Sequence, residues 1–91
     1  MLFEEKKMPI IARFYGIIIK MYFQQADHNP PHIHVIYGEN SGIVDIETSN
    51  LIEGDLPNRV LQLVKEWLPK YKNDLLTIWN TQQFKQLPPL E

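Results

Sequence analysis

Three histidines, His28, His32 and His34, lie within one short segment and are the only histidines of the 91-residue chain. An imidazole titrates near neutral pH, so it can act as a general acid or base, and its ring nitrogens are common ligands of transition metals. Two consecutive prolines, Pro30 and Pro31, separate the first histidine from the other two. This segment is therefore the first candidate for a functional site.

The first hypothesis for the segment is a metal site. Alternate residues of a strand project from the same face about 7 Å apart, so His32 and His34 can share one ion. His28 would add a third imidazole from the preceding loop, with Asp27 as a further ligand, and such a set suits a divalent transition metal. The chain has no cysteine, which excludes a zinc site of the cysteine type.

The second hypothesis is acid–base cleavage of a phosphodiester, with RNA as the substrate. Two imidazoles would exchange protons with the substrate, and His28, His32 and His34 are the candidate catalytic residues. Arg13 or Lys20 would hold the phosphate.

Two further interpretations involve no catalysis. In one, the polar face of the strand binds a partner protein through His32, His34 and acidic side chains of a neighbouring strand. In the other, the segment is only a turn, in which Asp27 and Asn29 accept backbone hydrogen bonds and the prolines stiffen the exit. The residue types leave all four interpretations open.

A β-hairpin is predicted to carry His32 and His34, with strands over 32–37 and 43–48 joined by the turn ENSG. Pairing the aliphatic residues of the two strands brings Asp45 and Glu47 onto the histidine face. A turn with a bulge at Gly42 would shift the register and bury both carboxylates, at a cost of several kcal/mol, so we prefer the apolar pairing. The aliphatic set is Ile33, Val35, Val44 and Ile46. The candidate binding residues are Asp27, Asn29, Arg13, Lys20, Asp45 and Glu47.

The remaining pattern predicts an α+β fold, an antiparallel β-meander of three to four strands followed by two C-terminal helices packed on one face. The stretch 10–23 is rich in β-branched and aromatic residues, which favours strand. We interpret Gly16 as a bulge within it, because a two-residue turn would force Tyr15 to a positive φ. A short edge strand is expected at 51–53.

After the strands the sequence predicts two helices, each with one stripe of apolar residues. Asp55 is the expected N-cap of the first helix, with Pro57 in its first turn, and Pro69 is expected to stop or kink it. The first stripe comprises Val60, Leu61, Val64, Trp67 and Leu68, and the second comprises Tyr71, Leu75, Leu76 and Trp79. Both stripes are interpreted as core.

The chain length predicts one domain over 8–84, with a loose extension at 1–7 and an extended tail at 85–91. Nine basic and eleven acidic residues give a net charge of −2, which argues against a broad electropositive surface for nucleic acid. The most apolar stretch is interrupted by charges and falls short of the about 20 residues of a membrane span. We therefore expect a cytoplasmic protein without a signal peptide or membrane association; the oligomeric state stays open.

The segments MPIIARFYGIIIKMYF, DHNPPHIHVIYGE and LPNRVLQLVKEWLPKYKNDLLTIWN follow one another in this order. From about Met8 to Trp79 the sequence thus resembles a family of small bacterial proteins whose domain has no known function. The resemblance implies that the hallmark segment contains Asp27, His28, Asn29, Pro30, Pro31, His32 and His34. Members look like partners in two-gene cassettes and have been proposed as components of toxin–antitoxin-like modules.

The resemblance implies a component of a toxin–antitoxin-like pair, with a cognate small protein encoded nearby. A His-dependent ribonuclease is the hypothesis for the toxin role. A non-enzymatic partner-binding protein and a histidine-based metal-binding protein are the alternatives.

Overall fold

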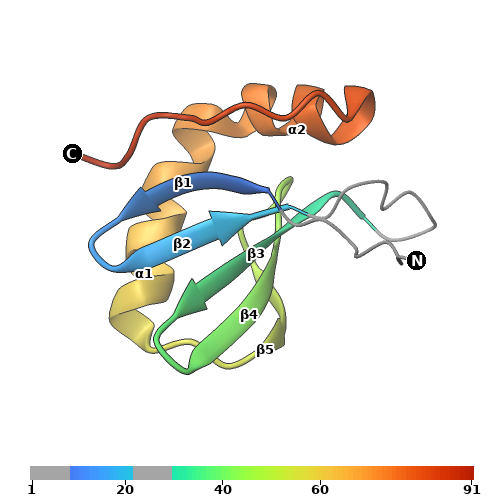
Figure 1. The fold of residues 1–91 in the computed structure, drawn as a ribbon. Helices are drawn as coiled ribbons and strands as arrows, with labels where there is room; N and C mark the ends of the chain where they lie inside the picture. Colours follow the sequence, from blue (N-terminus) through green and yellow to red (C-terminus); the bar gives the residue numbers. More distant parts are fainter. Residues whose placement is uncertain (1–8, 22–29) are drawn as a thin grey trace, which may run out of the picture.

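The sheet is a five-stranded antiparallel meander in which neighbouring strands follow the chain order (Figure 1). The computed structural model describes residues 9–21 and 30–91. The strands are β1 (Ile10–Phe14), β2 (Ile17–Lys20), β3 (His32–Tyr37), β4 (Asn40–Asp45) and β5 (Leu51–Gly54). The predicted α+β class is confirmed, but the described part of the chain has five strands rather than three to four, because the stretch expected to be one bulged strand forms two.

Tyr15 and Gly16 form the turn between β1 and β2, with Phe14 paired to Ile17. Both turn residues have positive φ, 49° and 80°, as in a type I′ turn. The interpretation of Gly16 as a bulge is therefore wrong. A type I′ turn matches the twist of the two strands, and hairpin pairing outweighs the strain of about 1–2 kcal/mol at a non-glycine residue.

Gly38 and Glu39 form the turn of the second hairpin, between β3 and β4. Gly38 has a φ of 61°, which glycine adopts without strain, and Tyr37 pairs with Asn40. The predicted turn ENSG is wrong, because three of its four residues belong to β4. Because the turn has two residues, Ile33 pairs with Val44, as the predicted pairing of aliphatic residues requires.

The helical part of the chain is one continuous segment in three joined pieces, α1 (Asn58–Trp67), the 3₁₀ turn η1 (Leu68–Tyr71) and α2 (Lys72–Thr81). Two separate helices were expected. Pro69 lies at the start of η1, where its fixed φ is tolerated, so the helix changes direction without ending. The N-cap is Pro57 rather than Asp55, because the N–H of Asp55 donates to Ser41 O and so continues the pairing of β5 with β4.

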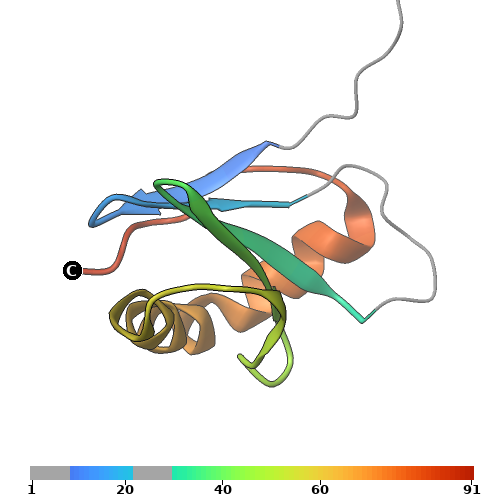
Figure 2. The same ribbon diagram turned by 90° about the horizontal axis from the view of Figure 1, so that it is seen from below.

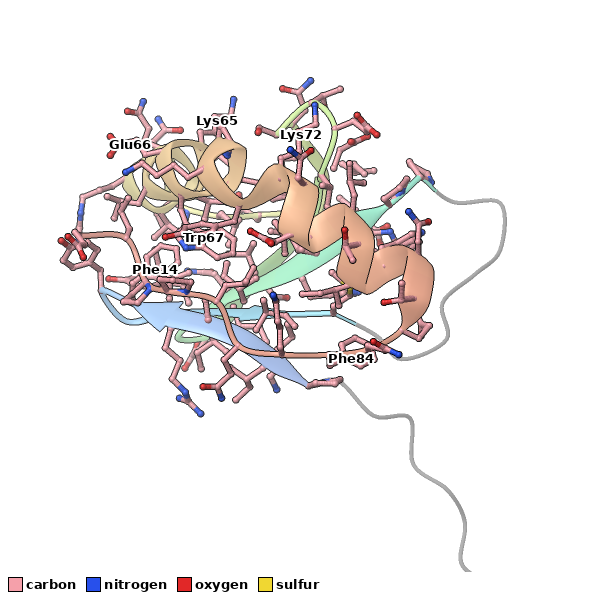
Figure 3. The ribbon with its side chains drawn as sticks, turned by 90° about the horizontal axis from the view of Figure 1, so that it is seen from above. Phe14, Lys65, Glu66, Trp67, Lys72 and Phe84 are labelled. Carbon is pink, nitrogen blue, oxygen red and sulfur yellow. The ribbon has the colours of Figure 1, made fainter. Side chains whose placement is uncertain are left out.

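The two α-helices lie on the same side of the sheet (Figure 2). Between them and the sheet lies Trp67, which is fully buried, with its ring centroid 5.4 Å from that of Phe14 (Figure 3). The helical stripes are confirmed as core at Val60, Val64, Trp67, Leu68 and Leu75. The strands, together with the residues directly after β2 and β4, contribute to the buried core Ile11, Ala12, Phe14, Ile17, Ile19, Met21, Ile33, Val35, Val44 and Ile46.

The C-terminal segment after α2 runs beside β1 (Figure 1). Its Leu87 N–H donates to Ile11 O at 2.7 Å, and Pro88 O accepts a hydrogen bond from Nε1 of Trp67 at 2.8 Å. Leu87 and Leu90 are buried in the core. The segment therefore covers the free edge of the sheet at β1. No helix in the described residues is both long and apolar enough to cross a membrane.

Candidate functional site

The face of the sheet that points away from the helices, which we call the outer face, is built from two rows of paired residues. Directly paired residues of antiparallel strands project from the same face. The alternate residues Ile19, Val35 and Val44 are buried beneath the helices, so their neighbours face outward. One row is Arg13, Ile18, Ile36 and Ser41; the other is Lys20, His34, Ile43 and Glu53.

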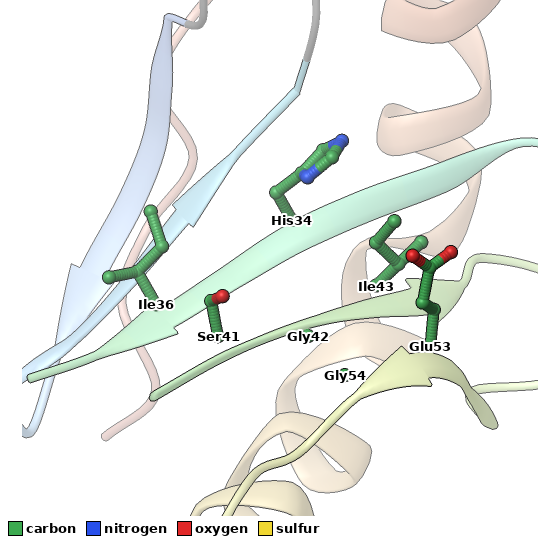
Figure 4. A pocket seen from close by; sticks show the side chains of 7 residues that line it. All are labelled: His34, Ile36, Ser41, Gly42, Ile43, Glu53 and Gly54. Atoms are coloured by element: carbon green, nitrogen blue, oxygen red, sulfur yellow. The ribbon is translucent and has the colours of Figure 1, made fainter. Parts of the chain in front are cut away.

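Two adjoining hollows lie on the outer face and share Ile43 and Glu53. The larger has a volume of about 280 Å³ and is lined by His34, Ile36, Ser41, Gly42, Ile43, Glu53 and Gly54. The smaller, of about 120 Å³, is lined by Pro30, His32, Ile43, Ile52 and Glu53. His34 and Glu53 rise from the same side of the sheet (Figure 4). Together the two hollows are lined by two imidazoles, isoleucine side chains and one carboxylate.

His32 and His34 are brought together as the alternation of β3 predicts. Their ring centroids are 5.3 Å apart, and the His32 ring lies 5.0 Å from the indole of Trp79 on α2. His32 is only 6% exposed. Its Nδ1 is 2.9 Å from Pro30 O, and because a carbonyl only accepts, Nδ1 carries the proton. In the neutral ring the lone pair is therefore on Nε2, the arrangement often found in metal-binding histidines.

His34 is held in its neutral form. Burial, and second the charge of the neighbouring His32, lower the pKa of His34 from 6.5 to about 4. Its Nε2 is shielded from solvent. A ring that is neutral at pH 7 contributes packing and hydrogen bonding rather than a positive charge.

The lowered pKa of His34 predicts a loss of stability in acid. The unfolded chain takes up this proton near pH 6.5 and the folded chain near pH 4, so the free energy of unfolding falls as the pH falls between these values. Because the ring is partly exposed, we expect a loss of about 2 kcal/mol. Urea unfolding at pH 7 and at pH 4.5 measures it. The variant His34→Gln should lose less stability over this range, and an equal loss in both proteins would contradict the prediction.

Of the two predicted carboxylates, Asp45 lies on the histidine face and Glu47 does not. Asp45 pairs with His32 across the hairpin, but its Oδ1 accepts the N–H groups of Glu47 and Thr48 at 2.7 and 3.1 Å, so it holds the turn after β4. Glu47 lies in that turn, and its Oε1 is 3.4 Å from Nζ of Lys72 on α2. The expectation that Glu47 continues the hairpin face is therefore wrong, because β4 ends at Asp45.

The two predicted phosphate-binding cations both lie on the outer face. Lys20 pairs with His34 between β2 and β3, and Arg13 pairs with Ile18 between β1 and β2. Asp27, His28 and Asn29 lie outside the described residues. Within residues 9–21 and 30–91, no three His, Asp or Glu side chains are grouped to hold a metal ion. Since the proposed metal site includes His28, it stays a prediction.

Sequence reasoning missed Glu53, Ile36 and Ser41 as neighbours of His34. A short edge strand was expected at 51–53, which placed the Glu53 carboxylate in the sheet, but no neighbouring residue was predicted for it. A register shift between β4 and β5, where Ile43 pairs with Glu53 and Val44 with Leu51, decides its position. Such a register shift does not change the alternation of polar and apolar residues, so the sequence alone does not predict it.

One family model, described as a domain of unknown function, matches residues 16–80. No curated protein and no solved structure matches the chain. The matched range includes β3, β4 and β5, and thus His34, Ile43 and Glu53. Because this range is more than half of the chain, the protein belongs to the family of the domain of unknown function DUF4160.

Proposed function

We propose that this protein is a non-enzymatic binding component of a toxin–antitoxin-like pair and that it binds its partner protein through the outer face. The observation that supports this most is that two adjoining hollows share Ile43 and Glu53 on the face of the sheet opposite the two α-helices. Apolar surface provides the affinity of a protein interface, and a charge beside it provides specificity. The expected partner is the small protein encoded nearby.

The burial of the two imidazoles and the lowered pKa of His34 favour a binding role over proton transfer. A general acid or base works best with a pKa near the operating pH and must reach its substrate. The pKa of His34 is lowered to about 4 and its Nε2 is enclosed, while His32 is almost fully buried. Both rings are therefore better suited to shaping the hollows than to catalysis.

A His-dependent ribonuclease is the second candidate function. The observation that favours it is the pairing of Lys20 with His34, which places the two residues next to each other on the outer face. A cation in this position could hold the phosphate of RNA while an imidazole transfers a proton. In this candidate function the protein would be the toxin of the pair.

The test is binding of the purified protein to the purified product of the neighbouring gene, measured by calorimetry. Glu53→Arg places a cation between the hollows and is expected to weaken binding about tenfold or more. The control Glu66→Arg makes the same change of charge on α1, on the side away from the sheet (Figure 3). Its affinity should equal that of the wild type.

The proposal fails if the two proteins do not bind, or if Glu53→Arg and Glu66→Arg bind equally well. The same samples are incubated with RNA, and we expect no cleavage. Cleavage by the wild type that is lost in His32→Ala would replace the binding function by the ribonuclease.

A further inference from the structure

The charges of the outer face are divided between its two flanks. Arg13 on β1 and Lys20 on β2 are the cations, and Glu53 on β5 is the anion. Asp55, which is exposed and donates its N–H to Ser41 O, adds a second carboxylate next to β5. Within the described residues none of these four side chains forms an ion pair. The central strand β3 separates the positive flank from the negative one.

Isoleucines occupy the middle of the outer face. Ile18, Ile36 and Ile43 are only partly buried, and Ile52 is 49% exposed. Apolar surface removed from water stabilises an interface by about 25 cal/mol per Å². The outer face therefore has an apolar centre between charged flanks, the usual anatomy of a protein interface.

We propose that a second copy of this chain packs face to face on the outer face, about a two-fold axis that runs along β3. This inference goes beyond the proposed function, and the second copy and the partner protein would occupy the same surface in turn. The axis lays β1 and β2 of each copy over β4 and β5 of the other. Arg13 of one copy then lies over β5 of the second copy, near Glu53, and Lys20 lies over the adjacent strand β4. The same contacts form twice.

Charge complementarity is the observation that favours a second copy as an occupant of the outer face. A surface with its cations on one flank and its anions on the other matches itself after such a rotation. Two sheets that pack face to face keep their strands within about 30° of each other, so the flanks stay aligned. Ile36 lies on the central strand, where the isoleucines of the two copies meet.

The larger hollow provides a place for a basic side chain of the second copy. Its lining contains the Glu53 carboxylate, the Ser41 hydroxyl and two isoleucines, and neither Arg13 nor Lys20 of the same chain. A long basic side chain can cover the isoleucines with its methylene groups and bring its charge to Glu53.

Sedimentation of the full chain over roughly 1 to 500 µM tests the inference. We expect a monomer–dimer equilibrium that salt shifts towards the monomer. Glu53→Arg sets like charges against each other and should raise the dissociation constant about tenfold or more. The double variant Arg13→Glu with Glu53→Arg restores opposite charges and should recover most of the affinity. Glu66→Arg is the control and should dimerise as the wild type does.

A wild type that stays monomeric throughout this range overturns the inference. So does a dimer that Glu53→Arg weakens no more than Glu66→Arg does, or that the double variant fails to restore. If the monomer still binds the neighbouring gene product through Glu53, the proposed function holds and only the second copy is wrong. If the chain dimerises as described but binds no partner protein, the proposed function fails alone.

Discussion

Replacing Trp67 by alanine is expected to lower the free energy of unfolding by about 4 kcal/mol, which is a large part of the total stability of a domain of this size. Trp67 is fully buried and packs on the rings of Phe14 and Tyr71, each at 5.4 Å between centroids. Its Nε1–H is also bonded to Pro88 O, which ties the C-terminal segment to α1. Alanine would leave a large cavity and an unpaired carbonyl group.

The milder variant Trp67→Phe separates packing from the hydrogen bond. It keeps an aromatic ring against Phe14 and loses the donor to Pro88 O, so we expect a loss of about 1–2 kcal/mol. Urea unfolding followed by circular dichroism measures both variants. If Trp67→Ala were no less stable than Trp67→Phe, the indole would not be the centre of the core.

Replacing Gly54 by alanine is expected to lower the free energy of unfolding by about 3 kcal/mol and to loosen β5. Gly54 has a φ of 92°, where an L side chain is strained. A Cβ at this position would lie 2.6 Å from Gly42 Cα and would also meet Ser41 O. Both obstacles are backbone atoms of β4, so the strands must separate. Because Glu53 is the preceding residue, the hollows should be lost as well.

Gly38→Ala is the matched control for Gly54→Ala. Gly38 also has a positive φ, of 61°, but a Cβ there would meet nothing within 4 Å. It should therefore show only the backbone strain of about 1 kcal/mol. Unfolding in urea gives both values, and hydrogen exchange shows whether the amides of β5 lose protection in Gly54→Ala. Equal losses in the two variants would mean that the close approach of β4 and β5 is not real.

The strand that carries His32 and His34 was predictable because its signal is local. Residues 32–35 alternate between polar and apolar side chains, and burial of Ile33 and Val35 requires one pairing register. The helical stripe from Val60 to Leu68 was equally clear, since apolar residues three and four apart lie on one helix face. In both cases neighbouring residues alone define the buried side.

The turns were less predictable, because small local costs are outweighed by packing elsewhere. Tyr15 accepts a positive φ since the strands it joins bury Ile17 and Ile19. Pro69 permits a bend since the 3₁₀ turn η1 tolerates a missing donor at its start. A strain of about 1–2 kcal/mol at one residue is small beside the burial of several aliphatic side chains.

The sequence alone established the α+β class, the helical stripes and the adjacent placement of His32 and His34, since each follows from short-range periodicity. The tertiary structure alone decided that Lys20, Ile43 and Glu53 lie in one row with His34. That row depends on three successive strand pairings and on a register shift between β4 and β5. It also decided the low pKa of His34, because desolvation depends on which distant groups exclude water from the ring.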